Sequence, residues 1–319
     1  MDALVSLPLL SYLVIPSFGS YSTSLNLLFF YMTWSTLVFS YKPVTLELVG
    51  TTFVRLMFYV LPSAGFLVFD SILPGLSANI KAQGKDGVPR ELPWKSTVQV
   101  VGVALFNVLL GIALQAGIET LLTDVFMVRS ALKASTTLPS PWKLGKDLLF
   151  GFVLREILYY YIHRYILHSS TRLAKLHGSW HHSNKVAYSF VAHYDHPIAW
   201  VLLRFIPTYA VAGIFRFHLL TYFLFLGIIS YEECITFSGY SIIPSRLLGS
   251  IARRQDVHLK NGGKGNYSAW VVLDFVHGTS AGGDVGQDSS DDNADKEITS
   301  STLLKSPRTG KTKKKGKSS

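Results

Sequence analysis

The sequence predicts an all-α integral membrane protein with four to six transmembrane helices and a histidine-rich cap on the cytosolic side. Of its 319 residues, 49% are hydrophobic and only 16% are charged, whereas charged residues make up about 25% of an ordinary soluble domain. Several uncharged stretches approach the roughly 20 apolar residues that cross a bilayer. Five histidines lie within residues 163–182, in the most polar part of the apolar second half.

The first predicted span is residues 25–41, which carry no charged residue. A cleaved signal peptide is not predicted, because no basic region precedes the N-terminal apolar stretch and Pro8 and Pro16 interrupt it. Residues 52–69 contain Arg55 and Pro62, so they are interpreted as either a kinked span or a re-entrant hairpin.

Residues 97–117 form the clearest predicted span, since they are uncharged throughout and long enough to cross the hydrocarbon core. A polar loop that ends in PSPWKLGKD then precedes an apolar helix, residues 148–168. That helix gains charge toward its C-terminal end and must leave the membrane there. Two short apolar stretches, 198–213 and 219–229, predict a helical hairpin. Because both ends of a hairpin face one side, residues 163–196 and 232–279 should meet in one compartment.

From residue 280 the composition changes to Gly, Ser, Asp and Lys, which bury too little apolar surface to fold. The predicted organisation is an N-terminal transmembrane region (1–144), a histidine-bearing domain (145–279) and a disordered basic tail (280–319). Lys315 and Lys317 have the spacing of a dilysine retrieval signal of endoplasmic-reticulum membrane proteins. A simple solvated basic tail is the alternative.

The net charge of +10 does not predict nucleic-acid binding. Most of the excess lies beside apolar segments, which is typical of loops retained on the cytoplasmic side near anionic lipid. The single cysteine, Cys234, cannot form an intramolecular disulfide. Any metal site must therefore use histidine and carboxylate ligands.

The histidines follow a spacing that suits metal binding. His163 and His168 lie in HRYILH, and His177, His181 and His182 lie in HGSWHH. On a helix, residues four apart share a face, so the second group can direct nitrogens to two adjacent metals. For a single histidine, a polar role at the membrane interface is the default interpretation. For the cluster as a unit, metal binding is the favoured interpretation, because neutral imidazole is a good ligand for iron.

At these motifs the chain resembles the fatty acid hydroxylase/sterol desaturase superfamily of membrane-bound di-iron oxygenases over roughly residues 145–280. HRYILH and HGSWHH match the first two histidine boxes of that family, and His196 before Pro197 matches a further histidine. Glu156 stands where the family usually has an aspartate, and is expected to orient a metal-bound imidazole or to form an interhelical ion pair. The resemblance implies the metal ligands His163, His168, His177, His181, His182, His196 and His258.

The chain departs from the family pattern in the third box. Only His258 remains of its three histidines, because Gln255 and Leu259 replace the others, and Phe237 replaces a histidine that the family commonly places before Ser-Gly-Tyr. At least one iron would then be under-coordinated. The sequence leaves four substitute ligands open: His193, Asp195, Glu233 and Asp256.

The resemblance implies oxidation of a C–H bond in a fatty acyl, sphingoid or sterol-like substrate with O2 at a di-iron centre, by hydroxylation or desaturation. Electrons would come from a separate donor such as cytochrome b5 or a reductase, since no flavin, haem or dinucleotide motif is present. Arg164, Arg172, Lys175 and Lys185 could meet an acidic donor. The alternatives are a catalytically inactive scaffold or lipid-binding protein and, less favoured, a transporter with a histidine relay.

Overall fold

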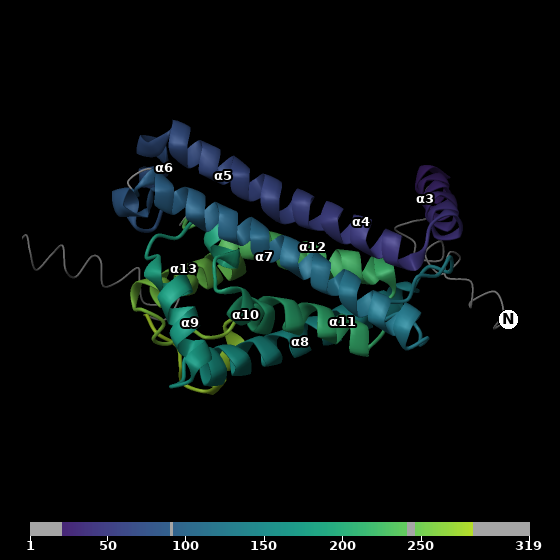
Figure 1. The fold of residues 1–319 in the computed structure, drawn as a ribbon. Helices are drawn as coiled ribbons and strands as arrows, with labels where there is room; N and C mark the ends of the chain where they lie inside the picture. The colour runs from purple at the N-terminus through teal and green to yellow at the C-terminus, as the bar shows by residue number, and fades with distance from the viewer. Residues whose placement is uncertain (1–20, 90–91, 241–245, 283–319) are drawn as a thin grey trace, which may run out of the picture. The chain divides into compact units, whose positions relative to one another are not determined.

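The computed structural model describes residues 21–89, 92–240 and 246–282, and within these ranges the chain is helical, with isolated bridges and no strand. This confirms the all-α prediction. The helices, shown in Figure 1, are α3 (Tyr21–Ser40), α4 (Pro43–Arg55), α5 (Leu61–Ile72), α6 (Pro74–Ile80), α7 (Trp94–Thr120), α8 (Pro141–Ile162), α9 (Arg172–Trp180), α10 (Pro197–Trp200), α11 (Val211–Ile214), α12 (Leu219–Thr236), α13 (Arg246–Lys260) and α14 (Val272–Val276).

Four helices in the described part of the chain are long and apolar enough to cross a membrane: Pro43–Ile72, Trp94–Val125, Pro197–Ile214 and Leu219–Thr236. Large apolar side chains on these helices, such as Phe53, Phe106 and Leu109, are exposed. Exposed apolar faces of this kind suit contact with lipid. The predicted span at 25–41 corresponds to α3, whose apolar part is shorter than these four helices.

Of the two interpretations of residues 52–69, the re-entrant hairpin is wrong, because a single continuous span is present. Residues Pro43–Ile72 form one helical run, in which the π-helical turn η2 (Leu56–Val60) joins α4 to α5. Pro62 lies in the first turn of α5. A proline cannot donate the backbone hydrogen bond of a continuous α-helix, and a π-turn is a common way to absorb that loss.

The helix predicted from residue 148 begins earlier, at Pro141. Ser140 caps it, because its hydroxyl accepts a hydrogen bond from the backbone N–H of Lys143, and proline suits the first helical position. The expected loop PSPWKLGKD is therefore partly helical. The charged side chains of α8 distinguish it from the four apolar helices.

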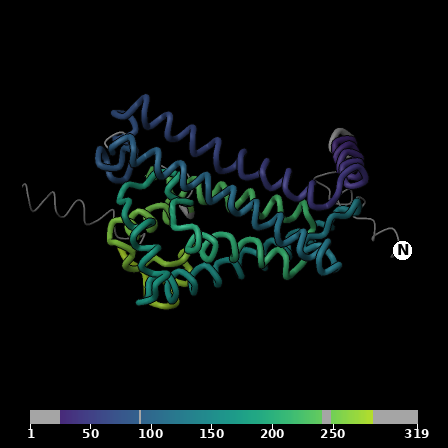
Figure 2. The backbone as a smooth tube through the Cα atoms, in the orientation of Figure 1, coloured from purple at the N-terminus to yellow at the C-terminus, as the bar shows by residue number. Residues whose placement is uncertain are grey.

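The predicted hairpin is present as two adjacent helical runs, Pro197–Ile214 and Leu219–Thr236. The first contains the π-helical segment η9 (Val201–Ala210). Figure 2 shows the segment around α13 and α14 beside the segment 163–196, at the same end of the helices. The two histidine-bearing segments therefore meet, as the hairpin requires.

Residues 1–144 and 145–279 are not separate bodies in the described part of the chain, because the described residues up to Ala281 belong to one compact unit. Packing between the regions is direct. Asn107 on α7 donates two hydrogen bonds of 2.9 Å to the backbone carbonyls of His193 and Asp195. The predicted disordered tail (280–319), with Lys315 and Lys317, lies outside the described residues from 283 onward.

Candidate metal centre

The first two histidines are brought together by a π-helical turn. Residues His163–Leu167 form η6, directly after α8. A π-helix pairs residues five apart, whereas an α-helix pairs residues four apart. The five-residue spacing of His163 and His168 therefore places them on one face, and their ring centroids lie 4.7 Å apart.

The second group begins on α9, which Thr171 caps through its hydroxyl. The helix ends at Trp180, and His181 and His182 lie in the short 3-10 turn η7 (His181–Ser183). The predicted face-sharing still holds for His177 and His181, whose rings stack at 5.0 Å. His182 stands nearly perpendicular to His177, at 85°.

The third contribution is His258, near the end of α13. Its ring centroid lies 4.8 to 5.1 Å from those of His163, His168 and His182. The loop that follows contains Gly263, with φ of +85°, a conformation that favours glycine. A Cβ atom at Gly263 would lie 2.2 Å from Cε1 of His168 and 2.8 Å from Nε2 of His182. The loop backbone therefore packs directly on the cluster.

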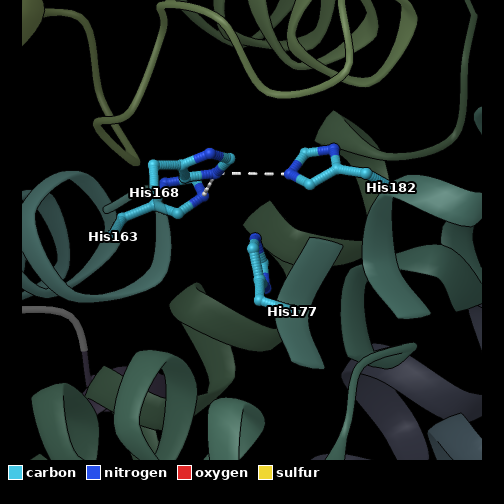
Figure 3. A group of neighbouring side chains, drawn as sticks. All are labelled: His163, His168, His177 and His182. Atoms are coloured by element: carbon cyan, nitrogen blue, oxygen red, sulfur yellow. Dashed lines mark hydrogen bonds between the residues drawn. The ribbon is translucent and has the colours of Figure 1, made fainter. Parts of the chain in front are cut away.

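Four of these histidines form a compact donor set: His163, His168, His177 and His182 each offer one ring nitrogen, and these nitrogens lie within 4.8 Å of one another. Figure 3 shows His163 and His168 together, with His182 opposite and His177 directed between them. The Nε2 atom of His168 lies 3.2 Å from Nε2 of His163 and 3.2 Å from Nε2 of His182.

The outer nitrogens of the rings are held by oxygen acceptors. Nδ1 of His163, His181 and His258 lies 2.6 to 2.8 Å from the carbonyl oxygens of Tyr267, Tyr194 and Gly265, respectively. A carbonyl oxygen can only accept, so each of these Nδ1 atoms carries the hydrogen. Nε2 of each ring is then left with a free lone pair.

His177 is oriented by a carboxylate, since its Nδ1 lies 2.6 Å from Oδ2 of Asp195. Such an outer partner fixes the tautomer and direction of a metal-binding imidazole. The Nε2 atoms of His177 and His258 are buried and have no hydrogen-bond partner. A buried polar atom without a partner is costly, and a metal ion would satisfy both.

The cluster keeps its rings neutral. Burial, and then the charges of nearby groups including His258, lower the pKa of His177 to about 3. Burial, followed by neighbouring histidines, likewise holds the pKa of His163 well below its usual range. Neutral imidazole is the metal-binding form. Buried donors, inward lone pairs and neutral rings together fit a metal ion.

Two predicted ligands lie at the edge of this set. His181 packs against His177 but also faces the ring of Phe237, at 6.0 Å between centroids. His196 caps α10, because its Nδ1 accepts from the backbone N–H of Ile198, and its ring contacts Trp180. In the described structure, His196 is therefore a helix-capping residue beside the cluster.

Glu156 is buried on α8, where Oε2 accepts a hydrogen bond of 2.9 Å from the backbone N–H of Trp270 and Oε1 has no hydrogen-bond partner. The carboxylate found on a cluster imidazole is that of Asp195. The interhelical ion pair considered for this region is made by the neighbouring Arg155, which pairs with Glu232 on α12 at 3.1 Å.

The residues that replace family histidines are buried. Phe237 and Leu259 belong to one apolar core cluster, and the Gln255 amide donates to the carbonyl of Ser268. In the described structure, the four side chains considered as substitute ligands already have hydrogen-bond or ion-pair partners. His193 and Glu233 bond each other, Asp256 pairs with Lys260, and Asp195 holds His177.

The residues that position the histidine rings were not identified from the sequence. Asp195 was only a possible ligand, and Gly263 and the carbonyls of Tyr267 and Gly265 carried no assigned role. The one available signal was the position of Asp195 next to a family histidine, in HYDHP. Its contact with His177, 18 positions earlier, depends on tertiary packing.

The fold and this site define a multi-pass, all-α membrane protein with a buried cluster of metal-competent histidines. Residues 148–279 match the model of the fatty acid hydroxylase family. This part of the chain is a fatty acid hydroxylase domain of the fatty acid hydroxylase/sterol desaturase superfamily. The match includes both intact histidine boxes and His258.

Several plant proteins are similar to the chain. Methylsterol monooxygenase 1-1 of Arabidopsis thaliana is 28% identical over 158 residues, which is 47% of this chain and 52% of that protein. Very-long-chain aldehyde decarbonylase GL1-8 of Oryza sativa subsp. indica is 26% identical over 253 residues, 77% of this chain and 89% of the relative. GL1-10 of Oryza sativa subsp. japonica, another such decarbonylase, is 30% identical over 153 residues, 46% of this chain and 50% of the relative.

The match thus spans about half the length of the methylsterol monooxygenase and most of that of GL1-8. No solved structure matches the chain. The relatives support membership of a lipid-modifying oxygenase family.

Proposed function

We propose that this protein is a membrane-bound oxygenase that oxidises a C–H bond of a lipid-like substrate with O2 at a metal centre, iron being the metal expected from the family. The observation that carries the proposal is the pair of buried, unpartnered Nε2 atoms of His177 and His258 within a cluster of neutral rings. When bound, iron would supply activation of O2.

The chain's own residues prepare that site. Asp195 and the carbonyls of Tyr267 and Gly265 orient the rings, so that the Nε2 atoms converge. Asn107, on a membrane-crossing helix, holds the backbone of the Asp195 loop. The site is therefore tied directly to the apolar helices, which supports a substrate that resides in the bilayer.

Hydroxylation would place one oxygen atom of O2 in the substrate and release the other as water, with two electrons and two protons from outside. Desaturation would remove two hydrogens and release both oxygen atoms as water. Either reaction needs an electron donor. Arg172 and Lys175 are exposed on α9, the helix that carries His177, so they offer a basic surface for an acidic donor such as cytochrome b5.

A catalytically inactive scaffold or lipid-binding protein is the second candidate. It is favoured by Phe237 and Leu259, which fill positions of family ligands with apolar side chains. Residence in the endoplasmic reticulum belongs to the proposal in either case, through the Lys315/Lys317 spacing.

Lipid analysis of cells that produce the full chain tests the proposal. We expect a lipid with a mass change of one added oxygen or two removed hydrogens, labelled by 18O2 in the first case. The product should be absent with His177→Ala. The matched control is His277→Ala, because His277 contacts Tyr160 and Tyr161 outside the cluster. Equal lipid profiles for wild type and His177→Ala would contradict the oxygenase and favour the scaffold.

A further inference from the structure

The two sides of the histidine cluster differ in the number of ring nitrogens that they offer to a metal. On one side, His163, His168, His177 and His182 bring four ring nitrogens within 4.8 Å of one another, with His258 beside them. His181 lies beside His177 and His182, at 5.0 and 5.2 Å between ring centroids, and its other ring neighbour is the apolar Phe237. The two sides differ in how many donors they could give to a metal.

On the side with more donors, the distances between ring nitrogens suit the ligands of a single metal ion. Imidazole nitrogens bound to one tetrahedral metal at typical bond lengths are separated by about 3.3 Å. The separations from Nε2 of His168 to those of His163 and His182 are both 3.2 Å. One ion between these rings would satisfy all three nitrogens.

The side beyond His181 is filled by apolar atoms. The ring of Phe237 lies 6.0 Å from that of His181 and is 2% exposed. Leu259 is fully buried in the same apolar core cluster. Neither side chain can bind a metal, so His181 would be the one imidazole available here among the described residues.

A positive charge also lies on this side. The guanidinium carbon of Arg204 lies 5.2 Å from the centre of the Phe237 ring. Arg204 is 5% exposed and is held by Glu233, at 3.2 Å. Glu233 is in turn shared with Arg55 and His193, so it does not serve as a free carboxylate ligand. A fixed cation in a buried site repels a second divalent cation.

We propose that the protein binds one metal ion, between His163, His168, His177, His182 and His258, and that Phe237, Leu259 and Arg204 occupy the place of a second. This inference deepens the proposed function and rests on the metal centre assumed there. It differs from the di-iron site that the sequence resemblance implies.

Counting metal ions per polypeptide tests the inference. The full-length protein, purified in detergent and stripped with a chelator, is titrated without oxygen with Co2+, whose visible absorption reports binding by imidazole. A parallel sample is loaded with Fe2+, separated from free metal and analysed by mass spectrometry for iron. We expect saturation at one equivalent and one iron per chain, with His277→Ala unchanged and His177→Ala strongly reduced.

Saturation at two equivalents would overturn the single-ion inference while leaving the proposed function in place. Binding of no metal would overturn both. A second experiment tests whether these side chains are the reason that only one ion binds. In it, Phe237, Gln255 and Leu259 are all changed to histidine. If the folded triple variant binds a second equivalent of metal, the result supports the inference that the native side chains occupy the position of a second ion. One equivalent in the folded triple variant would overturn that part, and the wild-type titration decides the inference whether or not the variant folds.

Discussion

Oδ2 of Asp195 lies 2.6 Å from Nδ1 of His177, and both side chains are buried. The loop that carries Asp195 is itself held by Asn107 on α7. The carboxylate therefore connects α7, a helix long and apolar enough to cross a membrane, to the orientation of an imidazole in the histidine cluster.

Replacing Asp195 should weaken metal binding without removing a ligand. We expect Asp195→Ala to lower metal affinity by roughly 10- to 100-fold, as is typical when the outer partner of a ligand histidine is lost. Asp195→Asn should lose less, because its amide oxygen can still accept from Nδ1. Metal affinity from the Co2+ titration checks both variants. Equal affinities in wild type and Asp195→Ala would contradict this role.

Gly263 offers a test of how closely the loop packs on the rings. Gly263→Ala should displace the rings of His168 and His182, because its Cβ would lie 2.2 Å from the first and 2.8 Å from the second. We expect at least a tenfold loss of metal affinity.

Gly262→Ala is a matched control for that variant. Gly262 also has a positive φ, of +63°, but the atom nearest to its Cβ is Nζ of Lys185 at 3.6 Å. Both variants strain the backbone, so only direct contact with the rings distinguishes them. A similar metal affinity in the two variants would show that strain alone is responsible.

The buried rings should make the metal-free protein less stable in acid. Burial, followed by nearby charges, lowers the pKa of His177 and His181 to about 3. Burial also lowers the pKa of His258 to about 4, against the opposing effects of its hydrogen bond to Gly265 and of Asp274. The value in the unfolded chain is about 6.5. Below pH 6.5 the unfolded state therefore binds more protons, and each such histidine lowers the free energy of unfolding by up to about 1.4 kcal/mol per pH unit.

Asp195 acts in the opposite direction, because burial raises its pKa to about 7 and the folded state then takes up a proton first. On acidification, the three histidines together lower the free energy of unfolding by more than Asp195 raises it. Thermal unfolding of the chelator-treated protein in detergent should therefore have a lower midpoint at pH 5.5 than at pH 7.5. A midpoint that stays constant or rises on acidification would show that the rings are not held neutral by burial.

Glu233 should be a main determinant of stability among the apolar helices. It pairs with Arg55 at 3.0 Å and with Arg204 at 3.2 Å, and it bonds His193. Glu233→Gln would leave two buried guanidinium groups without their counter-charge. Loss of one partner from a buried ion pair costs about 3–5 kcal/mol, so we expect a large fall in the unfolding midpoint.

The comparison variant is Lys143→Ala, which breaks a pair with Asp147 in which the lysine side chain is 46% exposed. An exposed pair of this kind contributes only about 0.3–0.5 kcal/mol. Comparable effects of the two variants on the midpoint would contradict the importance of the buried network.

The sequence predicted the fold and much of the site because both depend on local patterns. Uncharged stretches predicted the apolar helices, and the resemblance to the histidine-box family implied that His163, His168, His177 and His182 share a site, which the described structure brings together. The π-turn at 56–60 and the start of a helix at Pro141 were harder to predict, since they depend on local hydrogen-bond and capping geometry. The hydrogen bond of Asp195 to His177 and the contact of Phe237 with Arg204 depend on tertiary packing, which residue spacing does not encode.

X-ray absorption at the iron edge of the Fe2+-loaded protein shows whether the histidine cluster binds the metal, because it reports the atoms around the iron. We expect a shell of nitrogen ligands with the outer scattering of imidazole rings, no iron–iron distance, and fewer imidazoles in His177→Ala but not in His277→Ala. A spectrum of oxygen ligands alone, identical in wild type and His177→Ala, would contradict a metal centre at this histidine cluster.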